Sequence, residues 1–316
     1  MTAVHAVELA STAIAASSVS RAASVIADRW ALQILRHSFA GTRRFEEFQT
    51  RLHAPRSTLA GRLSGLVDRG VLERVRYQDV PPRYEYRLSA QGEDLYGATL
   101  LFLSWEQVWL PRSAALQPLR HKACGHVMSP ELICSACGKH ITFENTEYEL
   151  MPVSARSRVP APLFRRFSSA KKEMDRMAGR SLAQVSDIIG DRWSLMVLCA
   201  GFLGLKRFQA IQGALRIATN ILTCRLNQLV EHGMYSRRQY SEHPSRYEYH
   251  LTQKGRDLFP AAFMLMQWGD RWLMPASGGN LRVYHKCGCS LHGIVSCDRC
   301  GEPLRPDEVN VPARRF

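Results

Sequence analysis

Hydrophobic positions near the start of the chain follow a helical period. Apolar residues three or four apart predict a helix over Val19–Ser38, and then a short second helix that carries Phe45, Phe48 and Leu52 on one face. Gly41 lies between them, where glycine is typical of a helix end. The chain therefore opens with two helices joined by a short connection.

A third helix follows closely. Pro55 favours its start, because a missing backbone N–H costs little in the first turn of a helix. Leu59, Leu63 and Leu66 then form one apolar stripe, and Gly70 favours the helix end. We expect this helix to pack through that stripe and to leave its other side free.

Alternating residues replace the helical period after Gly70. They predict two strands, Leu72–Tyr77 and Tyr84–Leu88, joined by a proline-containing turn. A long apolar helix over Gly92–Leu110 ends at Pro111. Three helices, a two-stranded hairpin and a further helix are the order of a winged helix-turn-helix, whose third helix enters the DNA major groove. A helical domain with an incidental hairpin is the alternative.

The whole pattern occurs twice. Residues 25–110 align with residues 188–273 at a constant offset of 163, without a gap. A period of this length indicates two copies of a complete domain rather than a solenoid. The clearest shared landmarks are Asp28-Arg29-Trp30 with Asp191-Arg192-Trp193, Arg83-Tyr84-Glu85-Tyr86 with Arg246-Tyr247-Glu248-Tyr249, and Trp105 and Trp109 with Trp268 and Trp272.

Charge and composition narrow the class of protein. The 316 residues include 42 Lys and Arg against 28 Asp and Glu, a net charge of +14 that favours a polyanionic partner. No apolar run approaches the roughly 20 residues that span a bilayer. The beginning of the chain lacks the early positive charge of a signal peptide, so we expect a cytoplasmic protein. Nine cysteines there indicate metal ligands or free thiols rather than disulfides.

Seven of the nine cysteines form clusters after the winged helices. The first copy has Cys124, His126, Cys134 and Cys137, and the second has Cys287, Cys289, Cys297 and Cys300. The exchange of His126 for Cys289 at equivalent positions is compatible with tetrahedral zinc, which accepts imidazole and thiolate alike. We expect one structural Zn²⁺ per cluster, two per chain. His121 and His285 flank the clusters and remain alternatives as ligands or as outer hydrogen-bond partners.

These elements define the expected fold class, which is mainly α with small β-hairpins (α+β). Two winged helix-turn-helix domains lie in tandem, each followed by a small zinc-ribbon-like module. We expect the first winged domain at residues 18–111, its zinc module at 118–152, a linker with a basic helix at 153–180, the second winged domain at 181–275 and its zinc module at 282–312. Cys199 and Cys224 lie outside the clusters and are expected to be small buried residues.

The motifs resemble those of the HxlR-type winged-helix transcriptional regulators of bacteria. The resemblance rests on Ile188–Trp193, Lys206–Phe208, Arg225-Leu226, Arg246–Tyr249 and Leu251–Gly255, and on the same pattern in the first copy. Family members act as homodimers paired through terminal helices, which implies that this chain carries both halves of such a dimer. The two Trp-bearing helices would then pair, although plain core helices would show the same pattern. Many relatives carry a sensor cysteine where this chain has Ser17 and Arg180.

Polar residues at the start of each third helix are the candidates for base contacts. The first copy offers Arg56, Ser57, Thr58 and Arg62, and the second offers Thr219, Asn220, Thr223 and Arg225. Arg62 and Arg225 adjoin core leucines, so a structural role is the alternative for them. Thr219 is expected to cap its helix. Candidate phosphate contacts are Arg43, Arg44, Lys206 and Arg207 before the second helices, and Arg76, Arg83, Arg238 and Arg246 on the wings.

The sequence therefore predicts a sequence-specific DNA-binding transcriptional regulator. The unlike third helices predict an asymmetric operator with two different half-sites. The alternative is a zinc-stabilised interaction or scaffold module with only non-specific DNA affinity. No catalytic motif is found, so an enzyme is not expected. A small-molecule effector between the Trp-bearing helices and a further pairing of two chains are left open.

Overall fold

The computed structural model describes Ile14 and residues 17–110, 118–151, 185–243, 245–274 and 279–310. The expected linker and basic helix at 153–180, together with Arg180, lie outside these residues. Within the described residues, helices and small antiparallel hairpins account for the fold, as the sequence predicts. None of these helices has the length and apolar character needed to cross a membrane.

The first repeat has the order of a winged helix. Its helices are α2 (Ser18–Ile26), α3 (Arg29–Phe39), α4 (Phe45–Leu52), α5 (Arg56–Asp68), α6 (Ala90–Glu93) and α7 (Tyr96–Trp109). The wing consists of β1 (Leu72–Gln78) and β2 (Arg83–Leu88), which pair antiparallel. Beyond it lie β3 (Arg120–His121), β4 (Pro130–Cys134), the 3₁₀ turn η1 (Phe143–Asn145) and β5 (Thr146–Leu150).

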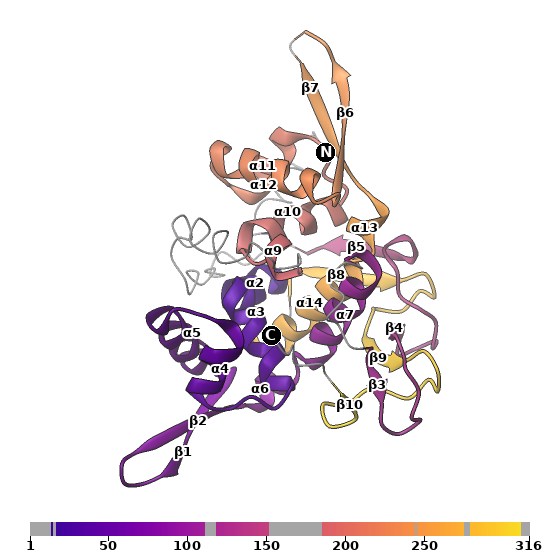
Figure 1. Ribbon diagram of the computed structural model, residues 1–316. Helices are drawn as coiled ribbons and strands as arrows, with labels where there is room; N and C mark the ends of the chain where they lie inside the picture. The colour runs from indigo at the N-terminus through magenta and orange to yellow at the C-terminus, as the bar shows by residue number, and fades with distance from the viewer. Residues whose placement is uncertain are drawn as a thin grey trace.

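The second repeat follows the same order. Its helices are α9 (Val185–Ile188), α10 (Arg192–Phe202), α11 (Phe208–Leu215), α12 (Thr219–Glu231), α13 (Gln253–Arg256) and α14 (Phe259–Leu273). The second wing is β6 (Tyr235–Ser241) with β7 (Arg246–Leu251), and the last strands are β8 (Leu281–His285), β9 (Gly293–Cys297) and β10 (Val309–Asn310). Figure 1 shows the two wings pointing away from each other at opposite ends of the molecule, with α7 and α14 between them.

Two expected helices are interrupted. The single helix over Val19–Ser38 is wrong, because Asp28 starts a new helix there: its Oδ1 accepts hydrogen bonds from the backbone N–H groups of Trp30 and Ala31, each at 3.1 Å. The long helix over Gly92–Leu110 is likewise divided into α6 and α7. A hydrophobic period does not reveal such breaks, because apolar residues are buried both before and after each of them.

The two repeats are related by a pseudo-twofold axis. The backbones of Asp28 and Asp191, equivalent residues 163 apart, form an antiparallel bridge with each other. Leu132 and Val295, also 163 apart, face each other in the ladder between β4 and β9. A residue that pairs with its own equivalent lies on a twofold axis, so these two pairs mark the axis at separate points of the molecule.

The repeats share one hydrophobic core along this axis. Helix α14 packs against both α7 and α2, and α9 packs against α3. The indole N–H of Trp105 donates to the Lys254 carbonyl oxygen at 2.9 Å, and Trp268 makes the equivalent bond to Gln91 at 2.8 Å. The Trp-bearing helices therefore form a pairing surface between the repeats, as the family resemblance implied.

The strands that follow the winged helices are interleaved. Strand β4 pairs with β9, β5 with β8, and β3 with β10, so each of these antiparallel strand pairs joins the first repeat to the second. The sequence indicated two separate zinc modules at 118–152 and 282–312. The structure instead shows one assembly to which both segments contribute, because the strands of each segment pair with strands of the other.

Candidate nucleic-acid interface and cysteine clusters

The third helix of each repeat presents polar groups at its N-terminal end. On α5, Arg56 and Ser57 are exposed and Thr58 is half-buried, while Leu59 and Leu63 of the apolar stripe are buried. The guanidinium of Arg56 stacks 4.9 Å from the ring centroid of Phe45. This arrangement matches the sequence prediction of one packed and one free side.

The equivalent end of α12 carries Thr219, Asn220 and Thr223, all exposed. Thr219 is the first helical residue rather than the cap, which is Ala218, so the expected capping role of Thr219 is wrong. Its Oγ1 instead accepts a hydrogen bond from Gln212 Nε2 at 2.8 Å. This bond ties α12 to α11, the preceding helix of the helix-turn-helix.

Neither third helix has a side-chain cap, since its N-cap residue is Pro55 in α5 and Ala218 in α12. The first-turn N–H groups therefore lack the usual Ser, Thr, Asp or Asn acceptor. An anionic oxygen is a suitable partner for such groups, and DNA phosphates supply one. This feature is compatible with helices that meet DNA end-on.

Arg62 and Arg225 are engaged inside the protein. Nε of Arg62 lies 2.8 Å from Oδ1 of Asp28, and Nε of Arg225 lies 3.0 Å from Oδ1 of Asp191. The Arg62 side chain is only 13% exposed. These ion pairs support the structural alternative for both arginines over a base contact. Arg62 and Arg225 attach α5 and α12 to the starts of α3 and α10.

Asp28 is therefore a junction between three elements. It caps α3, receives Arg62 from α5, and bridges to Asp191 across the pseudo-twofold axis. Burial raises the pKa of Asp28, and the Arg62 guanidinium beside it offsets part of that rise. The charges of Arg62 and Arg225, which lie on the third or recognition helices α5 and α12, are therefore paired with Asp28 and Asp191 beside the pseudo-twofold axis.

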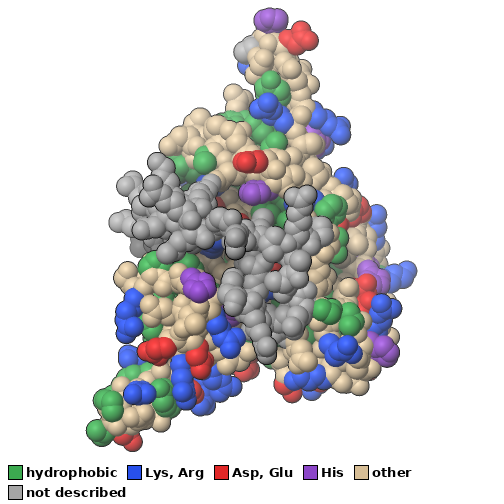
Figure 2. Space-filling view, in the orientation of Figure 1, with side chains coloured by type: hydrophobic (Ala, Val, Ile, Leu, Met, Phe, Trp, Pro, Cys, Tyr) green, Lys and Arg blue, Asp and Glu red, His purple; other side chains and the backbone are tan. Residues whose placement is uncertain are grey.

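The wings carry exposed cations. Arg76 and Arg83 lie on β1 and β2, and Arg238 and Arg246 lie on β6 and β7, where Arg246 is the equivalent of Arg83. Arg76 also contacts the exposed Asp79 at 3.2 Å, a pair that solvent screens strongly. Figure 2 shows blue side chains clustered along the lower wing and beside the upper one.

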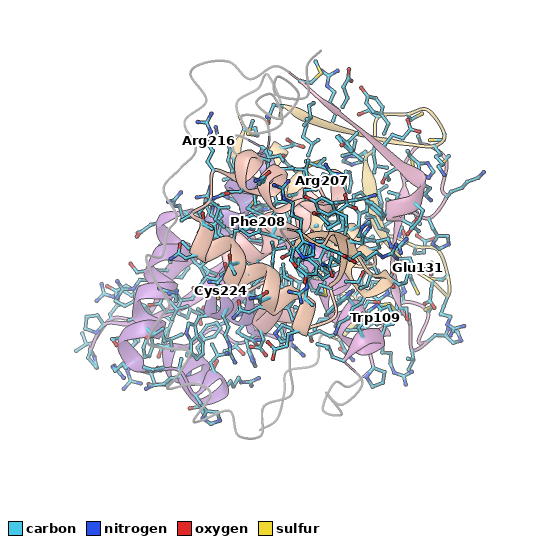
Figure 3. All side chains as sticks on the ribbon, turned by 90° about the horizontal axis from the view of Figure 1, so that it is seen from above. Trp109, Glu131, Arg207, Phe208, Arg216 and Cys224 are labelled. Carbon is cyan, nitrogen blue, oxygen red and sulfur yellow. The ribbon has the colours of Figure 1, made fainter. Side chains whose placement is uncertain are left out.

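A second group of cations precedes α4 and α11. Arg43, Arg44, Lys206 and Arg207 are exposed there. Arg44 lies 4.8 Å from the ring centroid of Tyr77, and Arg207 lies 4.8 Å from that of Tyr240, so both are held against a wing. Figure 3 labels Arg207 and Arg216 at the two ends of α11 and Cys224 on α12.

The cysteine and histidine side chains form two clusters. One contains His121, Cys124, Cys297 and Cys300, and the other contains Cys134, Cys137, His285 and Cys287. Within each cluster the four candidate ligand atoms lie within 4.8 Å of one another. Each cluster takes two residues from each repeat, so the pairing within one repeat that the sequence suggested is wrong.

The structure also changes the histidine and cysteine assignment. His126 and Cys289, both expected as ligands, lie outside the clusters, and His121 and His285 take their places. The backbone N–H groups of His126 and Cys289 remain important. They are the main cause that lowers the pKa of Cys124 and of Cys287 to about 6, which favours the thiolate.

The signal for these histidines is present in the sequence but shifted. A His-Lys pair precedes each first cysteine, yet His121 lies three residues before Cys124 and His285 lies two before Cys287. A search at a constant offset of 163 misses this relation. The structure places both histidines at the ends of β3 and β8, where they are buried.

The two cysteines outside the clusters differ from each other. Cys199 on α10 is buried, as expected, and burial raises the pKa of its thiol to about 12. Cys224 on α12 is exposed, so the expectation of a buried residue is wrong there. It lies one residue before Arg225 on the outer side of the helix.

Comparison with known proteins agrees with this geometry. Residues 25–114 and 188–277 each match the HxlR-like helix-turn-helix family. The two matches together span more than half of the chain, and the chain belongs to this family. It is a DNA-binding transcriptional regulator with two family domains in tandem.

Relatives and solved structures correspond to less than half of this chain. It is 43% identical over 136 residues to an uncharacterized HTH-type transcriptional regulator of Mycobacterium tuberculosis, which covers 43% of this chain and 86% of the relative. A Synechocystis regulator is 36% identical, with shares of 35% and 76%. Two solved structures are a candidate transcription factor from Pseudomonas aeruginosa (33% identical, TM-score 0.25, shares of 38% and 74%) and the oxidized redox regulator HypR (31%, TM-score 0.26, shares of 28% and 91%).

Proposed function

We propose that a single chain binds DNA as a pseudo-dimer on an asymmetric operator with two unlike half-sites. Helices α5 and α12 enter successive major grooves, and the wings contact phosphates. In Figure 1 both helices lie on the left side of the molecule, and the cysteine-bearing strands lie on the right. One DNA duplex along the left side would meet both helices.

The observation that carries this proposal is the link between the two recognition helices. Arg62 joins α5 to Asp28, Asp28 bridges to Asp191, and Arg225 joins Asp191 to α12. This chain of contacts crosses the pseudo-twofold axis in four residues. It sets the separation of the helices, and a set separation is what a fixed half-site spacing needs.

The difference between the half-sites follows from the exposed residues. Arg56 on α5 is suited to the O6 and N7 acceptors of guanine. Its equivalent, Thr219, is bonded to Gln212, and Asn220 beside it is suited to adenine. The two ends therefore favour different bases, although the helices have the same length and position in their repeats.

We further propose that each cluster binds one Zn²⁺ through three thiolates and one imidazole. Zn–S bonds of about 2.3 Å place two sulfurs about 3.8 Å apart in a tetrahedron, and a sulfur and a nitrogen about 3.5 Å apart. The Sγ atoms of Cys124 and Cys297 are 3.9 Å apart, as are those of Cys134 and Cys287. The S···Nδ1 distances, Cys300 to His121 and Cys137 to His285, are 3.4 Å.

Four protein ligands leave no open position, so the role of such a metal is structural. Because each ion would bind residues of both repeats, it would close a link between them. The crossed ligand sets therefore support zinc as a clamp on the pseudo-dimer rather than a brace for one repeat. Metal binding would add to the free energy of folding of this assembly.

Selection from a random duplex library tests the DNA proposal. We expect the zinc-loaded protein at near-physiological salt to enrich a motif of two different halves at one fixed spacing, near one helical turn or a multiple of it. A palindromic motif, or binding without any enriched motif that disappears as salt rises, would contradict the proposal.

Metal content tests the clamp. Native mass spectrometry of the full chain is expected to find two zinc ions. Cys287→Ser should remove one of them, whereas Cys289→Ser, two residues away and outside the cluster, should leave both. A folded chain without metal would contradict the zinc proposal, and loss of an ion in the Cys289→Ser control would show that the ligand sets are different.

A further inference from the structure

An apolar cavity of about 520 Å³ lies where the β5–β8 strand pair meets α10, α14 and the beginning of α2. Four phenylalanines dominate its wall: Phe143, Phe202, Phe259 and Phe263. The rings of Phe202 and Phe259 meet edge to face with centroids 5.4 Å apart, and Phe143 lies 5.8 Å from Phe202. Aromatic walls of this kind favour a flat ring between them.

The hydroxyl groups that line the cavity are already bonded. Tyr148 donates to the Leu203 carbonyl oxygen at 2.6 Å, Thr146 to that of Phe143 at 3.0 Å, and Ser17 to that of Ile14 at 2.7 Å. Among the described residues of the lining, no Lys, Arg or His is present, and the one carboxylate, Glu147, is exposed at the rim. An anion would find no counter-charge there, and a neutral apolar molecule would need none.

The described residues of the first repeat that correspond to part of this lining leave little space. Cys199 and Ala262 in the cavity correspond to Arg36 and Thr99 in the first repeat. Arg36 pairs with Glu106 at 3.1 Å, and both side chains are buried. The space beside Arg36 and Thr99 is only about 30 Å³.

We propose that this cavity is a binding site for a neutral, ring-containing small molecule, present once per chain. Its volume lies in the range of about 300–1,000 Å³ that is typical of small-molecule sites. This cavity differs in position and lining from the space between the Trp-bearing helices, which is where the sequence left open an effector site. Large rings without charge fit the phenylalanine wall, and carboxylates and phosphates do not.

The site is placed to affect DNA binding, a consequence that rests on the proposed function. Its wall includes Cys199 and Phe202 of α10, and α10 packs against both α11 and α12. It also includes Val19 of α2, which belongs to the first repeat. A ligand there contacts elements of both halves and alters how α12 sits relative to the axis.

Fluorescence titration with N-phenyl-1-naphthylamine tests the site directly, since this neutral dye brightens in apolar surroundings. We expect the full-length protein to bind one dye per chain. Ala262→Leu should weaken binding at least tenfold and Ala262→Phe further, because Ala262 lines the cavity and is buried. Thr99→Leu, the same change at the equivalent position of the first repeat, should leave it unchanged.

Displacement of the dye tests the chemical class. 2-Naphthol should displace it at least tenfold more effectively than 2-naphthoate, because the described residues of the lining include no cation. Absence of dye binding by the wild-type chain, or unchanged binding by the folded Ala262→Leu variant, would overturn the site. Equal displacement by the anion would overturn the assigned ligand class.

DNA binding gives an independent readout. Saturating dye should change the affinity for the selected duplex at least threefold in the wild type, and not in Ala262→Phe. Dye binding without a change in DNA affinity would overturn the proposed effect of the ligand on DNA binding, but it would still support the binding site. The dye titration does not involve DNA, so a failure of the proposed DNA binding and a failure of the proposed small-molecule site can be told apart.

Discussion

Single aspartates at the start of α3 and α10 determine much of the architecture. Asp28 and Asp191 each cap a helix and receive an arginine from the recognition helix 34 residues later. The same Asp and Arg spacing occurs in both repeats, so a structural role for Arg62 and Arg225 had a signal in the sequence. Their position on the third helix, beside residues that face solvent, favoured a DNA contact equally, and only the folded neighbours distinguish the two.

Asp270 on α14 provides a test at the level of one residue. Burial raises its pKa to about 6, and the side chain of Ser18 on α2 offsets part of the rise. An acid with a raised pKa in the folded state favours the fold when protonated, and that benefit is lost as pH rises through its unfolded pKa of about 4 toward 6. Asp270→Asn removes the charge while keeping the shape.

We therefore expect Asp270→Asn to be more stable than wild type above pH 6, by about 1–2 kcal/mol after discounting for partial solvent exposure, and equal to it below pH 4. Urea unfolding at pH 4, 5, 6 and 8 measures this difference. Asp68→Asn, on an exposed position of α5, serves as the control. A constant difference at all four pH values would show that the carboxylate is not desolvated.

The elements of each winged helix follow from local patterns. Strand alternation and the proline-containing turn predict both wings, and the apolar stripes predict α5 and α12, because each signal lies within one element. The break at Asp28 was not predicted, and His121 and His285 were named only as alternatives to the expected ligands. Asp28 caps α3 locally but is also paired with Arg62 of α5, and the histidines meet cysteines of the other repeat, contacts that a pattern within one element does not reveal.

The wings give a prediction at the element scale. Replacing Arg83 and Arg246 with alanine should weaken binding to the selected duplex. It should also make the slope of log K against log salt shallower by about 2, since each lost phosphate contact removes about one released counterion. Binding titrations from 50 to 300 mM salt measure the slope. Arg305→Ala, an exposed change in the cysteine-bearing assembly, should leave it as it is; an unchanged slope in the double variant would remove the wings from the interface.

At the scale of the whole molecule, duplication has become interdependence. The strand pairs β4–β9, β5–β8 and β3–β10 each need both repeats, and so do both cysteine clusters. The sequence shows two equal halves and gives no sign of this exchange, because the spacing within one copy is equally compatible with a site of its own. Pseudo-symmetry also hides the asymmetry of the apolar cavity, which depends on single substitutions such as Cys199 for Arg36.

We propose that one chain, held together by metal ligands from both repeats, is a complete DNA-binding unit. Native mass spectrometry of the protein mixed with its selected duplex tests this most directly. We expect one chain, two zinc ions and one duplex in the complex. Two chains on one duplex, or a DNA complex that forms equally well without zinc, would contradict it.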